Sequence, residues 1–202
     1  MTAEIKIWTI SMTNFLKKFL VLKIFFSSLL LLSIFSGTSM ANDTNPNKCL
    51  VLELKYGEVV IKFRPDLAPN HVARITELTN EGFYNGILFH RVIAGFMAQT
   101  GDPTGTGAGG SGKKLKAEFS KTPHVRGTVS MARAHSPDSA DSQFFIVFAP
   151  SRFLDGQYTV FGEVTSGMEY VDLIKKGDQD TGAVTNPDKI ISAKIIDAAD
   201  CH

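Results

Sequence analysis

Apolar and polar positions alternate along two neighbouring segments, residues 50–54 and 59–63, and Tyr56-Gly57 interrupts the alternation between them. Period-two alternation predicts strands whose successive side chains point to opposite faces of a sheet. A glycine-containing break between two such runs predicts that they form a β-hairpin.

Two other segments repeat apolar residues at the three-residue spacing of one helix face. These residues are Val72, Ile75 and Leu78 in the first segment and Met168, Val171 and Ile174 in the second. Glycine commonly follows the last turn of a helix. We therefore expect the first helix at about 69–80, before Gly82, and a second helix that ends at Gly177.

Short β-prone runs fill much of the remaining chain. They are residues 87–99 around Gly95, 127–132, 143–148, 158–164 and 189–197. Many short strands with two well-separated helices are typical of an antiparallel barrel or sandwich capped by helices, and not of a parallel α/β sheet. The sequence therefore predicts a mainly β fold.

The run at 143–148 predicts different surroundings for its two faces. Gln143, Phe145 and Val147 share one face, and Phe144, Ile146 and Phe148 share the other. Met97 and Gln99 likewise share one face of an earlier run. We expect the strand at 143–148 to be buried in the core on one side and to line a groove on the other.

The N-terminus has a different pattern. Three lysines precede an uncharged apolar run at 24–35, and small residues follow it up to Ala41. This order is typical of a cleavable signal peptide, so residues 1–41 are interpreted as one. We expect cleavage after Ala41, with cleavage after Ser39 as the weaker choice. An uncleaved anchor is the alternative, but the run has about a dozen residues and a membrane-spanning helix needs about 20.

The rest of the chain is then a short polar tether, residues 42–48, and one domain, residues 49–202. Of the 202 residues, 44% are hydrophobic and 20% are charged, which is ordinary for a globular protein. Removing residues 1–41 takes away four lysines and one glutamate, so the formal net charge falls from +1 to about −2. Such a charge indicates neither nucleic acid nor a membrane surface as the partner.

The two cysteines, Cys49 and Cys201, lie near opposite ends of the predicted domain. Export to an oxidising compartment would allow them to form a disulfide. Two unpaired cysteines at strand ends are the alternative, and the sequence leaves this choice open.

A glycine-rich stretch, residues 101–112, formally satisfies two nucleotide-binding motifs. Residues 105–110 fit G-x-G-x-x-G, and residues 107–113 fit most of a phosphate-binding loop. Both motifs need a strand directly before and a helix directly after, and the second needs Ser or Thr where this chain has Lys114. Because this context is missing, we do not expect nucleotide binding.

The five histidines show no H-E-x-x-H pair and no spacing typical of a zinc site, and no serine lies in a G-x-S-x-G turn. The sequence therefore predicts no metal, no cofactor and no hydrolase triad.

An ordered series of short blocks remains. The central block is Phe89-His90-Arg91-Val92-Ile93-x-Gly95-Phe96-Met97-x-Gln99-x-Gly101-Asp102, and the later blocks are Gly105-Thr106-Gly107 with Gly109-Gly110, Ser130-Met131-Ala132, Ser142-Gln143-Phe144-Phe145-Ile146, Phe153-Leu154-Asp155-Gly156 and Val160-Phe161-Gly162. Over about residues 49–199 this series resembles the cyclophilin family of peptidyl-prolyl cis/trans isomerases. The resemblance implies an eight-stranded antiparallel closed β-barrel capped by two α-helices, with the active groove on the outside of the barrel.

The resemblance also implies roles for individual residues. Arg91 would be the catalytic cation, and Gln99 would hold its guanidinium group. The proline pocket would consist of Phe96, Met97, Phe145 and Leu154. The substrate groove would be completed by Ala132, Arg133, Gln143, Phe153 and Tyr158.

Three positions differ from residues that are common in the family. Arg133 stands where Asn is frequent, but the family uses the backbone at this position to pair with the substrate. Phe153 and Tyr158 stand where many eukaryotic members have Trp and His, which resembles the bacterial branch. Phe153 has no indole N–H donor, the group with which many members bind the inhibitor cyclosporin.

By this resemblance the protein would catalyse rotation about X-Pro bonds in unfolded or folding exported proteins, as a periplasmic or secreted monomer. Its partners would be proline-containing polypeptides, without nucleic acid and without stable membrane association. A proline-peptide binding module with little catalysis is the alternative, and the presence of both Arg91 and Gln99 argues against it.

Overall fold

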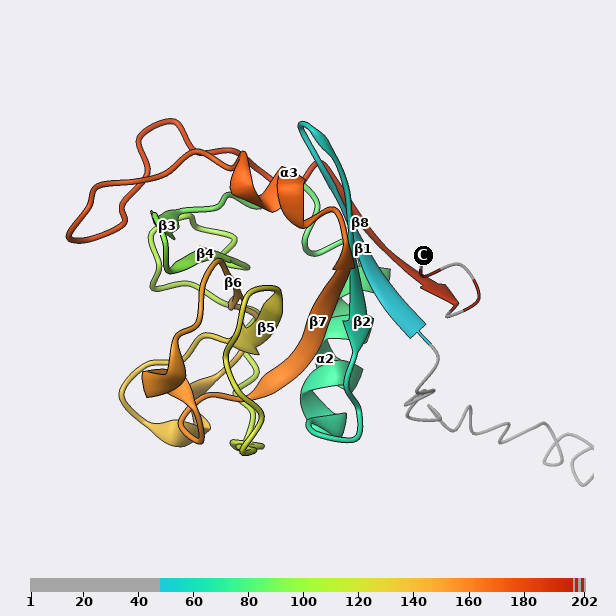
Figure 1. Ribbon diagram of the computed structural model, residues 1–202. Helices are drawn as coiled ribbons and strands as arrows, with labels where there is room; N and C mark the ends of the chain where they lie inside the picture. The colour runs from blue at the N-terminus through green and yellow to red at the C-terminus, as the bar shows by residue number, and fades with distance from the viewer. Residues whose placement is uncertain (1–47, 198, 200, 202) are drawn as a thin grey trace, which may run out of the picture. The chain divides into compact units, whose positions relative to one another are not determined.

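The computed structural model of the protein describes residues 48–197, 199 and 201 (Figure 1). The predicted signal peptide and residues 42–47 of the tether lie outside the described residues. Lys48, assigned to the tether from the sequence, is instead the first residue of a strand. None of the helices in the described part of the chain is long and apolar enough to cross a membrane.

Eight antiparallel strands form one curled sheet (Figure 1). The strands are β1 (Lys48–Leu54), β2 (Gly57–Phe63), β3 (Arg91–Ile93), β4 (Met97–Thr100), β5 (Thr128–Met131), β6 (Phe144–Val147), β7 (Val160–Ser166) and β8 (Ser192–Asp197). Their order in the sheet is β3-β4-β6-β5-β7-β2-β1-β8. The mainly β prediction is confirmed, and each predicted strand overlaps an observed one.

The described residues also form two α-helices and two short 3₁₀ turns: α2 (Pro69–Asn80), α3 (Met168–Asp172), η1 (Pro137–Ser139) and η2 (Arg152–Leu154). Helix α2 has the predicted bounds and begins with Pro69, which suits a first helical position because its missing N–H would have no partner there. Helix α3 ends at Asp172 and not at Gly177, whose N–H donates to the Val92 carbonyl at 2.8 Å and joins the chain to β3.

The predicted closure of the barrel is not confirmed, because β3 and β8 are the two ends of the sheet. The residues before β8 are irregular: Asn186 has a φ of 53°, and Pro187 has no N–H to give to a strand ladder. This segment contacts the outer edge of β3 through separate backbone hydrogen bonds. In one of them the Val92 N–H donates to the Gly182 carbonyl at 2.8 Å. The sheet is therefore an open half-barrel whose β3 edge is covered by a loop.

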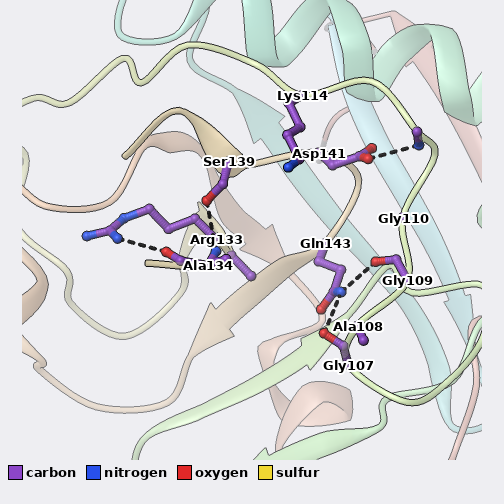
Figure 2. Close-up of a pocket in the computed structure, with 12 residues that line it drawn as sticks. Gly107, Ala108, Gly109, Gly110, Lys114, Arg133, Ala134, Ser139, Asp141 and Gln143 are labelled. Carbon is purple, nitrogen blue, oxygen red and sulfur yellow. Dashed lines mark hydrogen bonds between the residues drawn. The ribbon is translucent and has the colours of Figure 1, made fainter. Parts of the chain in front are cut away.

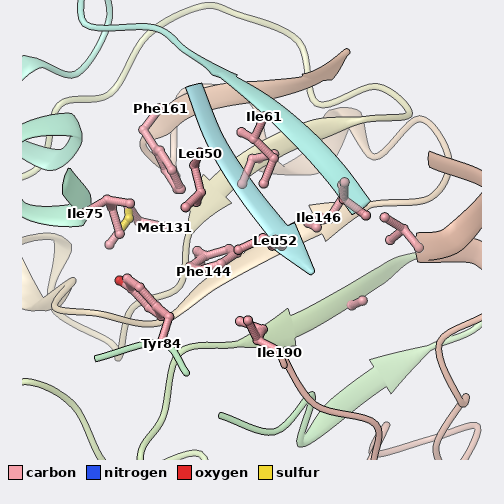
Figure 3. Close-up of a cluster of buried hydrophobic side chains, with 14 of the residues drawn as sticks. Leu50, Leu52, Ile61, Ile75, Tyr84, Met131, Phe144, Ile146, Phe161 and Ile190 are labelled. Atoms are coloured by element: carbon pink, nitrogen blue, oxygen red, sulfur yellow. The ribbon is translucent and has the colours of Figure 1, made fainter. Parts of the chain in front are cut away.

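The main core is one cluster of buried apolar side chains, among them Leu50, Ile75 and Phe161 (Figure 3). Helix α2, which carries Ile75, contacts β7 and β8. Phe144 and Ile146 of β6 belong to this core. Phe145 and Val147 of the same strand belong to a second apolar cluster. All four residues of β6 are buried, so the predicted burial of one face in the core is confirmed, and the groove along the other face stays a prediction.

Cys49 in β1 and Cys201 are joined by a disulfide in the structure, with their Cα atoms 6.1 Å apart. The bridge links positions separated by 152 in the sequence, so it connects the first strand to the end of the chain beyond the last strand. Its formation in the protein's native compartment stays a prediction.

Candidate active site

The second apolar cluster, which we call the outer cluster, lies on the face of β4 and β6 that points away from the main core. Its buried members are Met97, Phe145, Val147 and Leu154, and the partly buried side chains around them are Ile93, Phe96, Ala132 and Tyr158. Strand alternation places Met97 and Phe145 on this face, and η2 brings Leu154 to them. All four residues assigned to the proline pocket are therefore together, with Ile93 and Val147 as members that the sequence reasoning did not assign.

The guanidinium group of Arg91 lies at the edge of the outer cluster, with Nη1 4.0 Å from the Met97 sulfur. Nη1 donates to Gln99 Oε1 at 3.2 Å, and Nε donates to the Thr181 carbonyl at 3.0 Å. Both acceptors are neutral, so they orient the guanidinium without cancelling its charge. Nη2 takes part in neither bond.

A relay of amides continues from Arg91 to the glycine-rich loop. Gln99 Nε2 donates to Gln143 Oε1 at 2.9 Å. Gln143 Nε2 in turn donates to the carbonyls of Gly107 at 3.0 Å and Gly109 at 2.8 Å (Figure 2). Because each glutamine both donates and accepts, the orientation of each amide is fixed by its neighbour. The position of Arg91 is thereby coupled to the loop across the groove.

The glycine-rich loop is folded around the buried carboxylate of Asp102. Asp102 accepts hydrogen bonds from the backbone N–H groups of Thr104 at 2.7 Å, Gly107 at 2.6 Å and Gly109 at 3.1 Å. A β-carbon on Gly109 would lie 2.1 Å from Asp102 Oδ1, so this approach requires glycine. Burial alone would raise the pKa of Asp102, but the bonds from Thr104, Gly109 and Gly107 outweigh it and lower the pKa to about 2.

In this arrangement the glycine-rich stretch lacks the context that the two nucleotide-binding motifs require. A phosphate would need the loop's backbone N–H groups, and Asp102 already accepts from several of them. The residues that follow the loop, up to β5, are irregular and form no helix. The loop serves as a wall of the groove.

A pocket of about 560 Å³ lies between this loop and the segment after β5 (Figure 2). Gln143 and Ala132 line it, together with Gly107, Gly109, Lys114, Arg133 and Asp141. The Ala132 N–H donates to the Gln143 carbonyl at 2.9 Å, which fixes the backbone on this side of the groove.

The side chain of Arg133 folds back toward the protein. Its Nε donates to the Gln157 carbonyl at 3.1 Å, and its guanidinium carbon lies 4.7 Å from the centre of the Tyr158 ring. Tyr158 in turn packs edge-to-face on Phe145, with ring centres 5.8 Å apart. Arg133 therefore packs on Tyr158, and Tyr158 packs on Phe145 of the outer cluster.

Phe153 is the most exposed of the predicted site residues, with 66% of its surface accessible. Its ring lies against Phe96, with centres 5.4 Å apart. Phe153 and Phe96 together extend the apolar surface outward from the outer cluster. Every predicted groove residue thus lies on the same side of the sheet as Arg91.

Two supports of the site could not be assigned from the sequence. The Thr181 carbonyl holds Arg91 from 90 positions away, and a backbone atom leaves no signal in the residue type. His124 is fully buried and its ring stacks on Phe145 with centres 6.2 Å apart. A lone histidine after a proline carries no motif, so only the fold shows where it lies.

The fold and this site define a β-rich protein in which an oriented cation, Arg91, lies at the edge of an apolar cluster. The family model described as "Cyclophilin type peptidyl-prolyl cis-trans isomerase/CLD" matches residues 49–195. The chain therefore belongs to the cyclophilin family of peptidyl-prolyl cis/trans isomerases and is an enzyme of that class.

Curated relatives agree with this assignment. The chain is 55% identical over 168 residues to a probable peptidyl-prolyl cis-trans isomerase of Brucella abortus, covering 77% of this chain and 86% of the relative. It is 45% identical over 122 residues to peptidyl-prolyl cis-trans isomerase B of Bacillus subtilis, covering 60% of this chain and 85% of the relative.

Solved structures with a similar fold are also cyclophilins. A cyclophilin from Hirschia baltica has a TM-score of 0.66 at 28% identity, covering 78% of this chain and 76% of its own. A Cryptosporidium parvum cyclophilin, solved in the presence of the dipeptide Ala-Pro, has a TM-score of 0.67 at 27% identity, covering 73% of this chain and 98% of its own.

Proposed function

We propose that Arg91 is the catalytic cation of this isomerase and that the outer cluster holds the proline ring of the substrate. The observation that carries this proposal is the Arg91 guanidinium at the edge of the cluster, bonded to Gln99 Oε1 and to the Thr181 carbonyl. A cation held by two neutral groups beside an apolar surface suits a reaction in which no bond breaks.

Rotation about an amide bond is resisted by about 18–20 kcal/mol, because the nitrogen lone pair is delocalised into the carbonyl. In the twisted state the nitrogen recovers its lone pair and can accept a hydrogen bond. An Arg91 N–H aimed at that nitrogen stabilises the twisted state more than either planar state, which is differential binding of the transition state. Neither a nucleophile nor a metal is needed for this step.

The outer cluster contributes by position and by exclusion of water. Phe145, Met97 and Leu154 would hold the proline ring while the residue before it turns. Apolar surroundings also strengthen the interaction of Arg91 with the substrate, since less water screens it. An unaided rotation takes tens of seconds, so a turnover of about 10² s⁻¹ needs roughly 4–6 kcal/mol of stabilisation. One charged hydrogen bond with good orientation can supply this.

The substrates we propose are proline-containing polypeptides that are exported together with the enzyme. The signal-peptide pattern of residues 1–41, with cleavage after Ala41, supports a periplasmic or secreted location for a mature monomer. The disulfide partners Cys49 and Cys201 suit an oxidising compartment. The use of an Ala-Pro dipeptide with the Cryptosporidium parvum relative supports the substrate class.

A proline-containing chromogenic peptide assay on the purified protein tests these roles. Arg91→Ala should lose most of its turnover and keep its circular dichroism spectrum, because the side chain lies in the groove. Arg126→Ala is the control, since Arg126 pairs with Asp172 at 2.6 Å outside the outer cluster. Unchanged turnover in folded Arg91→Ala would remove the mechanism, and tight peptide binding without turnover in the unmodified protein would favour the binding module.

A further inference from the structure

His124 forms a second layer behind the outer cluster. Its ring is fully buried and stacks on the ring of Phe145, with centres 6.2 Å apart and planes inclined by 19°. Tyr158 packs edge-to-face on Phe145 at 5.8 Å. The Phe145 ring is therefore packed against two further aromatic rings.

Both ring nitrogens of His124 have polar partners on different elements. Nδ1 lies 3.1 Å from Asp155 Oδ1, directly after η2, and Nε2 lies 3.1 Å from Ser130 Oγ in β5. The backbone N–H of His124 also donates to Asp155 Oδ1, at 2.8 Å. These bonds fix the plane of the imidazole as well as its position.

The polar partners of His124 are themselves held by further groups. An ionised Asp155 can only accept, so Nδ1 donates to it. The Ser130 hydroxyl donates to the Thr159 carbonyl at 2.9 Å, which fixes the oxygen that lies 3.1 Å from His124 Nε2. Burial lowers the pKa of His124, and Asp155 only partly opposes this effect.

We propose that His124, oriented by Asp155 and Ser130, is a positioning residue that holds Phe145 in the conformation that receives the substrate's proline ring. This inference rests on the proposed role of the outer cluster. If the Phe145 ring is already ordered before the substrate binds, no binding free energy is lost in ordering it. If Phe145 adopts the competent conformation only part of the time, the apparent dissociation constant rises by the inverse of that fraction.

His124→Phe tests the proposal because it keeps an aromatic ring beneath Phe145 but removes both polar anchors. If the competent fraction of Phe145 falls to about one fifth, KM should rise about fivefold and kcat at saturating substrate should stay within about twofold. Asp155→Asn retains an oxygen acceptor for Nδ1 and should stay near the unmodified KM, whereas Asp155→Ala should reproduce the rise in KM.

His71→Phe is a matched control. His71 is also fully buried, and its Nδ1 lies 2.6 Å from Glu118 Oε2, but it belongs to α2 and not to the outer cluster. Loss of folded protein lowers the amount of active enzyme and therefore the apparent kcat, but it does not change KM. His71→Phe should therefore keep the unmodified KM even if it lowers the melting temperature.

The outcomes separate this inference from the proposed function. An unchanged KM in His124→Phe, while Arg91→Ala abolishes turnover, would overturn the positioning role and leave the site assignment standing. A rise in KM of equal size in His71→Phe would overturn it as well. If His124→Phe does not fold, Asp155→Ala decides: an unchanged KM there, in folded protein, contradicts the proposal.

Discussion

Gln99 lies directly opposite Arg91 in the β3–β4 register, and its Oε1 accepts a hydrogen bond from Arg91 Nη1 at 3.2 Å. The amide gives orientation and leaves the positive charge intact. Gln99→Glu would place a carboxylate at the same position and partly neutralise the cation. We expect kcat to fall by about tenfold or more, which corresponds to about 1.4 kcal/mol of lost transition-state stabilisation. Asn80→Asp, at the exposed end of α2, is the matched amide-to-acid control and should leave kcat unchanged.

Phe144 and Phe145 are adjacent residues of β6 that face opposite sides of the sheet. Phe145→Ala should remove the main aromatic surface for the proline ring and raise KM about tenfold. Phe144→Ala should destabilise the protein by about 3–5 kcal/mol as a core truncation, yet leave KM of the folded fraction unchanged. Urea unfolding and steady-state kinetics on both variants measure the two effects, and equal KM values would contradict the assignment of the faces.

Burial lowers the pKa values of His90 and His124 below that of an exposed histidine, although nearby carboxylates partly oppose the shift. The unfolded chain then binds protons more readily than the folded protein once the pH falls below about 6.5. Stability should therefore decrease from pH 7 to pH 5, by up to about 1.4 kcal/mol per pH unit for each histidine. Melting temperatures across this range test the sign, and His124→Phe should flatten the dependence; a rise in stability toward pH 5 would contradict it.

Reduction of the Cys49–Cys201 bridge should lower the free energy of unfolding by about 4–5 kcal/mol if the bridge is unstrained, since it closes a loop of 152 positions. Catalysis should change little below the melting temperature, because neither cysteine belongs to the outer cluster. Thiol titration of protein from its native compartment decides whether the bridge forms. Two free thiols would exclude it.

Cyclosporin should inhibit this protein weakly. Its carbonyl that accepts a Trp indole N–H in many cyclophilins would meet the Phe153 ring, which has no donor. An unmade buried hydrogen bond costs about 1–3 kcal/mol, or roughly five- to 150-fold in affinity. Phe153→Trp should restore much of the sensitivity while turnover of the peptide stays normal. Binding by the unmodified protein as tight as that of a Trp-containing cyclophilin measured alongside would show that Phe153 is wrongly placed.

The sequence predicted those parts of the fold that depend on local periodicity. The alternation at Phe144 and Phe145 assigned both faces of β6, and the spacing of Val72, Ile75 and Leu78 assigned α2. The predicted closure of the barrel is not confirmed, because strand propensity near residue 189 does not reveal that the loop before it meets β3 only through separate backbone bonds.

The candidate site likewise has some contacts that the sequence predicts and others that only the folded structure shows. Arg91 and Gln99 lie eight residues apart on one hairpin, so their contact can be predicted from the single motif in which both residues occur. The Thr181 carbonyl and the His124 ring reach the site only through tertiary packing. Their contribution depends on where the chain places a backbone atom or a buried ring, and residue type alone does not encode that.

Lys48 and Asp197 are partners in the β1–β8 register, so the start of the first strand lies beside the end of the last strand. None of the predicted groove residues lies on these two strands. A short linker could therefore join the two ends and new ends could be opened in a surface loop elsewhere, as circular permutation requires. By the same geometry, the whole domain could be inserted into a loop of a host protein as a self-contained folding catalyst, with its groove free to reach the host's own prolines.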